Sequence, residues 1–196
     1  RFLFAWQHVG TGQLSQRDDL LEIVGQLQGI EAAAGAWEQS LLPARIASYD
    51  PAWLDDLCLG GQISWGRLAP RPDPAATPTR AAPISLMLRR DLAWLLAPAH
   101  NSSGPSLQAC EETLGSGAKN VLHYLRSAGA SFLEDITAAL DLRRADAEED
   151  LWELVAAGFL SADGFASLRA LLPKPERQGG SKQGKVRWYS QASNQQ

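Results

Sequence analysis

One stretch of the sequence has the spacing of a catalytic motif. Residues 179–185 read GGSKQGK and match the GxxxxGK pattern of loops that cradle the phosphates of ATP. Such a loop needs a Ser or Thr directly afterwards to hold magnesium, and a helix whose N-terminus faces the phosphates. Val186 stands at that position and no helical pattern follows it. We therefore expect no ATP site in this stretch.

The other residues with chemical potential are also poorly spaced for catalysis. His8, His100 and His123 have no second His, Cys or carboxylate at ligand spacing, so we expect no metal site. Cys58 and Cys110 lie far apart without CxxC spacing, which favours a reducing cytoplasm over a disulfide framework. The sequence contains no GxSxG and no DExx box. We expect no catalytic centre and no cofactor in this chain.

Tryptophan is the residue type that points to binding. An indole at a periodic apolar position is usually core, but an exposed one can stack on the bases of single-stranded DNA. We expect one or two of the rings to be exposed. Trp6 is the best candidate, because it lies at a helix end before a glycine turn; the alternative is that it packs the first helix onto the body. The seven tryptophans are Trp6, Trp37, Trp53, Trp65, Trp94, Trp152 and Trp188.

Arginine residues near a proline-rich segment could supply the phosphate contacts. They flank or occupy APRPDPAATPTRAAP, or close the strand after it, so this segment could carry a small positive patch. The alternative is a solvated loop. The candidates are Arg67, Arg71, Arg80, Arg89 and Arg90. A second basic group, for which the alternative is disorder, comprises Lys174, Arg177, Lys182, Lys185 and Arg187.

The net charge of −4 is unevenly distributed. Residues 1–118 carry 8 basic and 12 acidic side chains, residues 119–165 carry 4 and 9, and residues 166–196 carry 6 and 1. This distribution excludes a globally basic surface, so nucleic-acid contacts would be local. No run approaches the roughly 18 apolar residues of a membrane span, and we expect no membrane partner. The first residue is not Met and RFLFAWQHV is an apolar helix end, so we expect a fragment that begins upstream.

Helices precede a hairpin in the first half of the sequence. RDDLLEIVGQLQG has helical spacing after Ser15 as a possible N-cap. A further helix is expected over residues 32–48, and Pro43 should kink it or split it. Asp50-Pro51 is a sharp helix start. QISWGRL and PISLMLR alternate like two strands of one hairpin, and RDLAWLLA continues as a strand end or short helix. Helices leading into a hairpin with a long tip predict a winged helix.

The same order of elements recurs later in the chain. Three helical patterns are followed by FLSADGF, which predicts a strand and a tight Asp-Gly turn. We therefore predict a mainly α fold with small β hairpins (α+β) and tandem winged-helix units. The expected divisions are a winged-helix unit at 1–97, a linker at 98–117, an acidic winged-helix unit at 118–172, and a basic tail at 173–196 that is disordered or holds a short strand.

Residues 143–158, RRADAEEDLWELVAAG, fall where a recognition helix would lie. Their apolar face consists of Ala147, Leu151, Leu154 and Val155, and the acids lie mainly on the other side. Acidic side chains in a major groove would meet phosphates of like charge. We therefore expect this helix to serve in packing and not to read DNA.

The sequence resembles a known family. The segments RFLFAWQHV, LQGIEAAAGAWEQSLLPARI, YDPAWLDDLCLGGQISWGRL and LWELVAAGFLSADGFASLRALL are similar to the accessory domain that follows the motor of the large helicase-related (Lhr) DNA helicases. The resemblance covers residues 1–172. It implies winged-helix and β-barrel elements in an AlkZ-like layout. At the tail, VRWYSQ stands where the family tends to have a GRWSLL-like strand, a departure from the pattern.

The resemblance also implies a function. The intact protein would be a cytoplasmic ATP-dependent 3′ to 5′ translocase acting in DNA repair, with ATP and magnesium in upstream RecA-like motor domains. Its partners would be single-stranded DNA and RNA:DNA hybrid, and Trp6 would match a family tryptophan that stacks on a base. One alternative is a DNA glycosylase-like repair module, for which Gln26 and Gln28 are weak candidates because they do not face one another on a helix. A second is a protein-protein adaptor that docks a basic partner.

Overall fold

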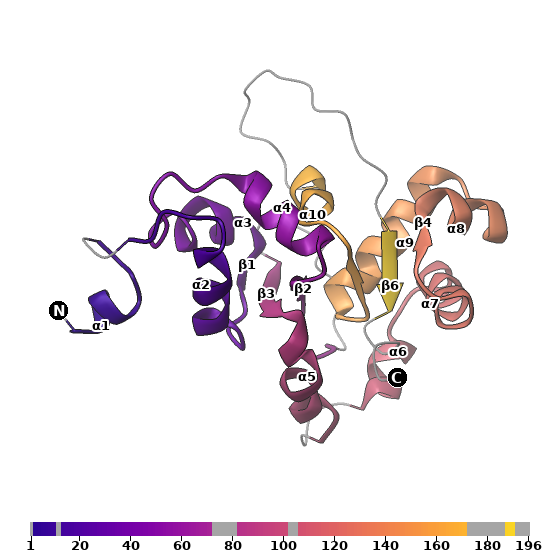
Figure 1. The fold of residues 1–196 in the computed structure, drawn as a ribbon. Coiled ribbons are helices and arrows are strands. Elements are labelled where there is room, and N and C mark those ends of the chain that lie inside the picture. The colour runs from indigo at the N-terminus through magenta and orange to yellow at the C-terminus, as the bar shows by residue number, and fades with distance from the viewer. Residues whose placement is uncertain (1, 11–12, 72–81, 102–105, 172–186, 191–196) are drawn as a thin grey trace.

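The part of the chain that the structure describes is mainly helical and contains two small three-stranded antiparallel sheets. Figure 1 shows most elements of residues 2–101 on one side of the molecule and those of residues 107–157 on the other, with the helix of residues 165–171 beside the helix of residues 51–59. We call residues 2–101 the N-terminal half and residues 106–190 the C-terminal half. Among the described residues, no helix is long and apolar enough to cross a membrane. The computed structural model describes residues 2–10, 13–71, 82–101, 106–171 and 187–190.

The N-terminal half contains the hairpin that the alternating pattern predicts. Its two strands pair antiparallel, with Ile63 opposite Leu88 and Trp65 opposite Leu86. The hairpin is confirmed, and a third strand extends the sheet to the order β1-β3-β2. The elements are α1 (Phe2–Trp6), α2 (Asp19–Leu27), β1 (Ala32–Ala33), α3 (Ala34–Ala36), the π-helix η1 (Trp37–Leu41), α4 (Pro51–Leu59), β2 (Ile63–Gly66), β3 (Pro83–Leu88), the 3-10 turn η2 (Arg89–Asp91) and α5 (Leu92–Asn101).

Two helix starts follow from local side-chain chemistry. The Asp19 carboxylate accepts the backbone N–H groups of Ser15 and Gln16 at 3.0 and 2.8 Å. Asp19 therefore satisfies donors at the start of α2, and the predicted N-cap Ser15 does not. At α4, Asp50 accepts the N–H of Ala52 at 2.9 Å, as the Asp-Pro pair predicts. The buried face of α2 is also confirmed, with Leu20, Ile23, Val24 and Leu27.

The helix predicted over residues 32–48 is wrong at both ends. Ala32 and Ala33 form β1 because they pair with β3, where Ala32 lies opposite Ile84. The helical part begins at Ala34 and ends at Leu41, two residues before Pro43. Proline has no backbone N–H to continue a helix, so the chain turns there.

The C-terminal half is built around the second sheet, in the order β4-β6-β5. The predicted hairpin turn at Asp163-Gly164 is wrong, because a helix begins at Phe165 and the partner of β5 is the distant strand β6. Helix α6 lies inside the segment predicted as a linker, and the division into units stays a prediction. The elements are α6 (Leu107–Glu112), α7 (Ser116–Ala128), β4 (Ser131–Phe132), α8 (Leu133–Leu140), α9 (Arg144–Ala157), β5 (Leu160–Ala162), α10 (Phe165–Leu171) and β6 (Arg187–Ser190).

One continuous hydrophobic core joins the two halves. The Trp65 indole on β2 donates to the carbonyl oxygen of Gly164 at 3.2 Å, and its ring meets Phe165 edge-on at 6.2 Å. The Ser161 hydroxyl on β5 donates to the Trp65 carbonyl. Five tryptophans lie in this core or against it, and two are exposed, as expected. The five are Trp37, Trp53, Trp65, Trp152 and Trp188.

Candidate nucleic-acid interface

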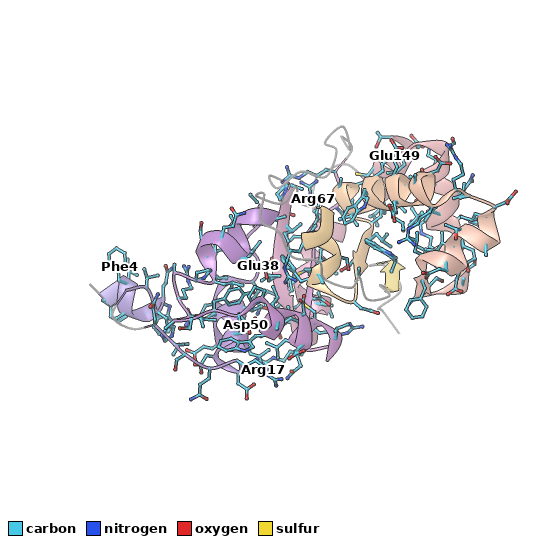
Figure 2. The ribbon with its side chains drawn as sticks, turned by 90° about the horizontal axis from the view of Figure 1, so that it is seen from above. Phe4, Arg17, Glu38, Asp50, Arg67 and Glu149 are labelled. Carbon is cyan, nitrogen blue, oxygen red and sulfur yellow. The ribbon has the colours of Figure 1, made fainter. Side chains whose placement is uncertain are left out.

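Helix α1 presents apolar side chains to solvent. Trp6 is 62% exposed and its ring stacks on that of Phe2, with centroids 6.4 Å apart and planes 25° apart. Leu3 and Phe4 are exposed as well, and α1 buries no residue. Figure 2 shows Phe4 at the outer end of the molecule. Trp6 therefore does not pack α1 onto the described body, and the ring pair is open to a flat ligand.

A short connection holds α1 next to α2. The backbone N–H of Val9 donates to the Phe4 carbonyl at 2.9 Å, which closes the helix end. His8 has a left-handed backbone, φ +55°, and its Nε2 lies 3.1 Å from the Glu22 carboxylate on α2. Glu22 belongs to the first turn of α2, which also carries Asp19, whereas Asp18 just before the helix pairs with Arg17 at 3.3 Å.

Arg67 lies in the interior, between the two halves. It is 7% exposed, and its Nη1 donates to the carbonyl oxygen of Ala156 at the end of α9. Its Nε is 4.0 Å from the Glu31 carboxylate. Burial lowers the pKa of the Arg67 guanidinium, and the Glu31 charge opposes that shift. These contacts favour a role in packing for Arg67.

Arg71 shares the same carboxylate but reaches the surface. Its Nη2 lies 3.2 Å from Glu31 Oε2 and its side chain is 58% exposed. Glu31 also accepts the backbone N–H of Leu68 at 3.0 Å, and the Arg71 N–H donates to the Ala157 carbonyl. The charge of Arg71 is thus partly neutralised by Glu31. Arg80 lies outside the described residues.

The hairpin register separates the remaining arginines from this pair. Gly66 lies opposite Ser85 at one end of the β2-β3 ladder, whereas Ile63 lies opposite Leu88 at the other end. Arg67 and Arg71 follow the first end, and Arg89 and Arg90 follow the second. The four candidates that the structure describes, Arg67, Arg71, Arg89 and Arg90, are therefore not brought into one patch.

Arg89 and Arg90 are exposed in η2, beside a tryptophan that sequence reasoning did not single out. Arg90 has an 80% exposed side chain, with its Nε 3.9 Å from Asp91. Trp94 on α5 is 59% exposed. Trp94 was one of the seven tryptophans of the sequence, in the segment RDLAWLLA that was predicted as a strand end or short helix. The helix is observed, and Arg90 lies just before it in η2.

The acids of α9 have structural partners. The predicted inward face, Ala147, Leu151, Leu154 and Val155, is buried. The Glu153 carboxylate accepts the backbone N–H of Gly115 at the start of α7, at 2.6 Å. Burial, followed by the charges of Glu153, Glu149 and Asp146, raises the pKa of Asp150 to about 6. Glu153 therefore joins α9 to the N-terminus of α7.

Other chemistry has little support among the described residues. They contain no group of three or more His, Cys, Asp or Glu side chains that could hold a metal. The cysteines Cys58 and Cys110 are both buried and free. Basic residues of the tail from Lys174 to Lys185 lie outside the described ranges. What the structure offers is exposed aromatic and cationic side chains.

A family model and two curated relatives all point to the same protein family. Residues 1–89 match the family model described as large helicase-related protein, winged-helix domain. The chain is 32% identical over 183 residues to "Lhr helicase/ probable uracil glycosylase" of Mycolicibacterium smegmatis, covering 91% of this chain and 11% of that protein. It is 26% identical over 161 residues to "Lhr helicase/uracil glycosylase" of Escherichia coli K12, covering 79% and 10%.

The chain spans about a tenth of the length of the curated relatives it matches. The match to the family model covers α1, the whole β1-β3-β2 sheet and the helices between them. The resemblance noted in the sequence is thereby confirmed: this chain belongs to the large helicase-related (Lhr) family, and residues 1–89 are its winged-helix domain.

Proposed function

We propose that this chain is a nucleic-acid-binding accessory module of an ATP-dependent 3′ to 5′ helicase, and that it grips the single-stranded loading strand. The observation that carries the proposal is the exposed Trp6–Phe2 ring pair on a winged-helix domain of this family. An exposed indole can hold a base by stacking, whatever the base. ATP and magnesium act in RecA-like motor domains of the parent protein, and RNA:DNA hybrid is a further substrate.

The layout proposed for the module has two winged helices, as in AlkZ-type proteins. In the C-terminal half, α7, α8 and α9 supply the three helices and the β4-β6-β5 sheet supplies the wing. The acids of α9 disfavour a role for its outer face in reading DNA. The DNA-facing surface is therefore assigned to the N-terminal half, with Trp6 and the exposed arginines Arg71, Arg89 and Arg90.

Titration of the 196-residue chain with a labelled thymidine oligonucleotide tests the proposal. Trp6→Ala should weaken binding roughly 5- to 100-fold, the range expected for the loss of one stacked base. Leu59→Ala is the matched control, because Leu59 is a 67% exposed apolar residue on α4. Affinity should fall with salt, with a log–log slope of about −0.7 for each phosphate neutralised. Equal affinity of Trp6→Ala and the wild type would remove Trp6 from the site.

A DNA glycosylase-like repair module is the second candidate, favoured by the names of both relatives. Of the weak catalytic candidates, Gln28 is engaged in packing: its amide donates to Asp91 at 2.9 Å and accepts the N–H of Leu88 at 3.2 Å. Gln26 Oε1 is buried without a hydrogen-bond partner among the described residues. Incubation with uracil-containing DNA tests this candidate, and failure to release base would exclude it for this chain.

A further inference from the structure

Trp94 is the second exposed tryptophan, and it lies on a different helix from Trp6. It is 59% exposed, and within the described residues no ring contact or hydrogen bond of its side chain is recorded. Helix α5 packs against the rest of the N-terminal half through Leu95. Leu95 is buried, and its Cδ2 lies 3.9 Å from the position that a Cβ on Gly29 would take. Adjacent helical residues point about 100° apart, so burial of Leu95 turns Trp94 outward.

The residues near Trp94 in the sequence have small or positively charged side chains. Ala93 and Ala97 are exposed beside it, and their methyl groups leave room for a flat ligand. Arg90 precedes Trp94 by four residues, and its side chain is 80% exposed. Asp91, the acid nearest in sequence, accepts the Gln28 amide at 2.9 Å and lies 3.9 Å from the Arg90 Nε. An exposed aromatic ring in the first turn of α5 thus follows an exposed cation in η2, which leads directly into that helix.

We infer that Trp94 and Arg90 form a second contact for single-stranded DNA, a step that rests on the proposed function. A base stacks on the Trp94 ring, and the phosphate next to that base pairs with the Arg90 guanidinium. The ligand is single-stranded because a duplex covers the faces of its bases. The exposed guanidinium of Arg90, just before the helix that carries Trp94, attracts the phosphate, whereas α1 is joined to the first turn of α2 through Glu22, an acid.

The positions of α1 and α5 define the path of a bound strand over the molecule. Figure 1 shows α1 and α5 at separate edges of the N-terminal half, with α2 between them. A strand that contacts both tryptophans therefore crosses the N-terminal half and avoids the acidic helix α9. Base contacts at two separate places let a module hold a strand without sequence preference.

Two measurements on the 196-residue chain test this contact. The first is titration with a thymidine oligonucleotide of about 20 nucleotides, which exceeds the roughly 4 to 16 nucleotides of typical single-strand sites. Trp94→Ala should weaken binding roughly 5- to 100-fold, and Arg90→Gln should make the salt slope less steep by about 0.7. Ala97→Glu should also weaken binding, since it places a carboxylate beside the ring. Ala138→Glu on α8, another exposed alanine, is the matched control and should have no effect.

The second measurement locates the base directly. An oligonucleotide containing 5-iododeoxyuridine should photocrosslink to the peptide that carries Trp94, as identified by mass spectrometry. If the wild type binds and Trp6→Ala weakens binding, but Trp94→Ala binds normally and no crosslink maps to α5, this inference is overturned and the proposed function survives. If the wild type binds no single strand, both fail. Tighter binding to uridine RNA of the same length would overturn the assignment to DNA.

Discussion

Arg169 on α10 holds Glu38 on the π-helix through two hydrogen bonds, Nε to Oε2 at 2.7 Å and Nη2 to Oε1 at 2.8 Å. The same guanidinium donates to Asp55 on α4 at 2.8 Å. Tyr49 completes the cluster, because its hydroxyl donates to Glu38 at 3.0 Å. One cation of the C-terminal half therefore pairs with two carboxylates of the N-terminal half.

Loss of this cation should weaken the whole molecule. Arg169→Ala leaves Glu38 and Asp55 partly buried without a positive partner, and we expect the free energy of unfolding to fall by roughly 2 to 3 kcal/mol. This is below the range for fully buried pairs, because the Arg169 side chain remains 32% exposed. Urea unfolding followed by circular dichroism measures the change.

Arg143→Ala serves as the control for that experiment. Arg143 pairs with Asp146 at 2.7 Å, but its side chain is 85% exposed, so its removal should leave the free energy of unfolding nearly unchanged. Equal losses for the two variants would contradict a structural role for the Arg169 cluster.

Arg67→Ala should affect stability and not DNA binding. The substitution leaves the Ala156 carbonyl without its donor and Glu31 without its neighbour, and should cost about 1 to 3 kcal/mol. Arg71→Ala, at an exposed side chain on the same carboxylate, should cost much less. Unfolding curves and oligonucleotide titration at a temperature where both variants are folded separate the two effects. If Arg67→Ala lowered the affinity for DNA without lowering the stability, Arg67 would be a DNA-binding residue and the prediction would be wrong.

Charge reversal on α9 should leave DNA binding intact. Figure 2 shows Glu149 and Phe4 on opposite sides of the molecule, so a strand on α1 does not contact Glu149. The affinity of Glu149→Lys at physiological ionic strength, where the screening length is about 8 Å, should stay within about twofold of the wild type. A large loss of binding, or a gain of several-fold, would place the nucleic acid near α9.

Asp150→Asn should stabilise the protein in a defined pH range. The pKa of Asp150 is raised to about 6 by burial and by Glu153, Glu149 and Asp146. Between pH 4 and 6 the folded state retains a proton that the unfolded chain has released, so stability falls as pH rises and the cost is complete above about pH 6. The variant lacks this cost, and its melting temperature should exceed that of the wild type at pH 7.5 and match it at pH 4.

Glu149→Gln is the comparison for Asp150→Asn, because it removes one neighbouring charge and should give a smaller gain of the same sign. The Asp150 carboxylate lies beside Gly117 at the start of α7, where the helix dipole favours an anion. An unchanged melting temperature of Asp150→Asn at pH 7.5 would mean that this dipole offsets the cost of burial.

Local patterns predicted the elements whose cause is local. The apolar spacing of Leu20 to Leu27, the Asp50 cap and the inward face of α9 each depend on residues within one or two turns. The hairpin was also predictable, since its strands alternate regularly. For the candidate site, the expectation that one or two tryptophans are exposed is confirmed, although Trp94 was not identified.

Features that depend on distant partners were not predictable. Ala32 and Ala33 have no strand preference and become β1 only because β3 offers an open edge. Arg67 looked like a surface cation, but the Ala156 carbonyl that accepts its hydrogen bond lies 89 residues away in the sequence. The partner of β5 is β6, which lies within the segment predicted as a basic tail. These pairings join residues that are distant in the sequence, so local patterns in a single sequence cannot predict them.

Gly158, the residue that ends α9, illustrates what such a distant contact demands. Its backbone φ is +86°, and a Cβ there would lie 3.2 Å from the Ala69 carbonyl oxygen and 3.3 Å from the Pro70 Cα. In a saturation-mutagenesis map, every substitution at this loop position should score as damaging, although the residue has no side chain and touches no ligand. Such a map would mark Gly158 as strongly as an active-site residue. The reason would be that the segment of Ala69 and Pro70 approaches too closely to leave room for a side chain.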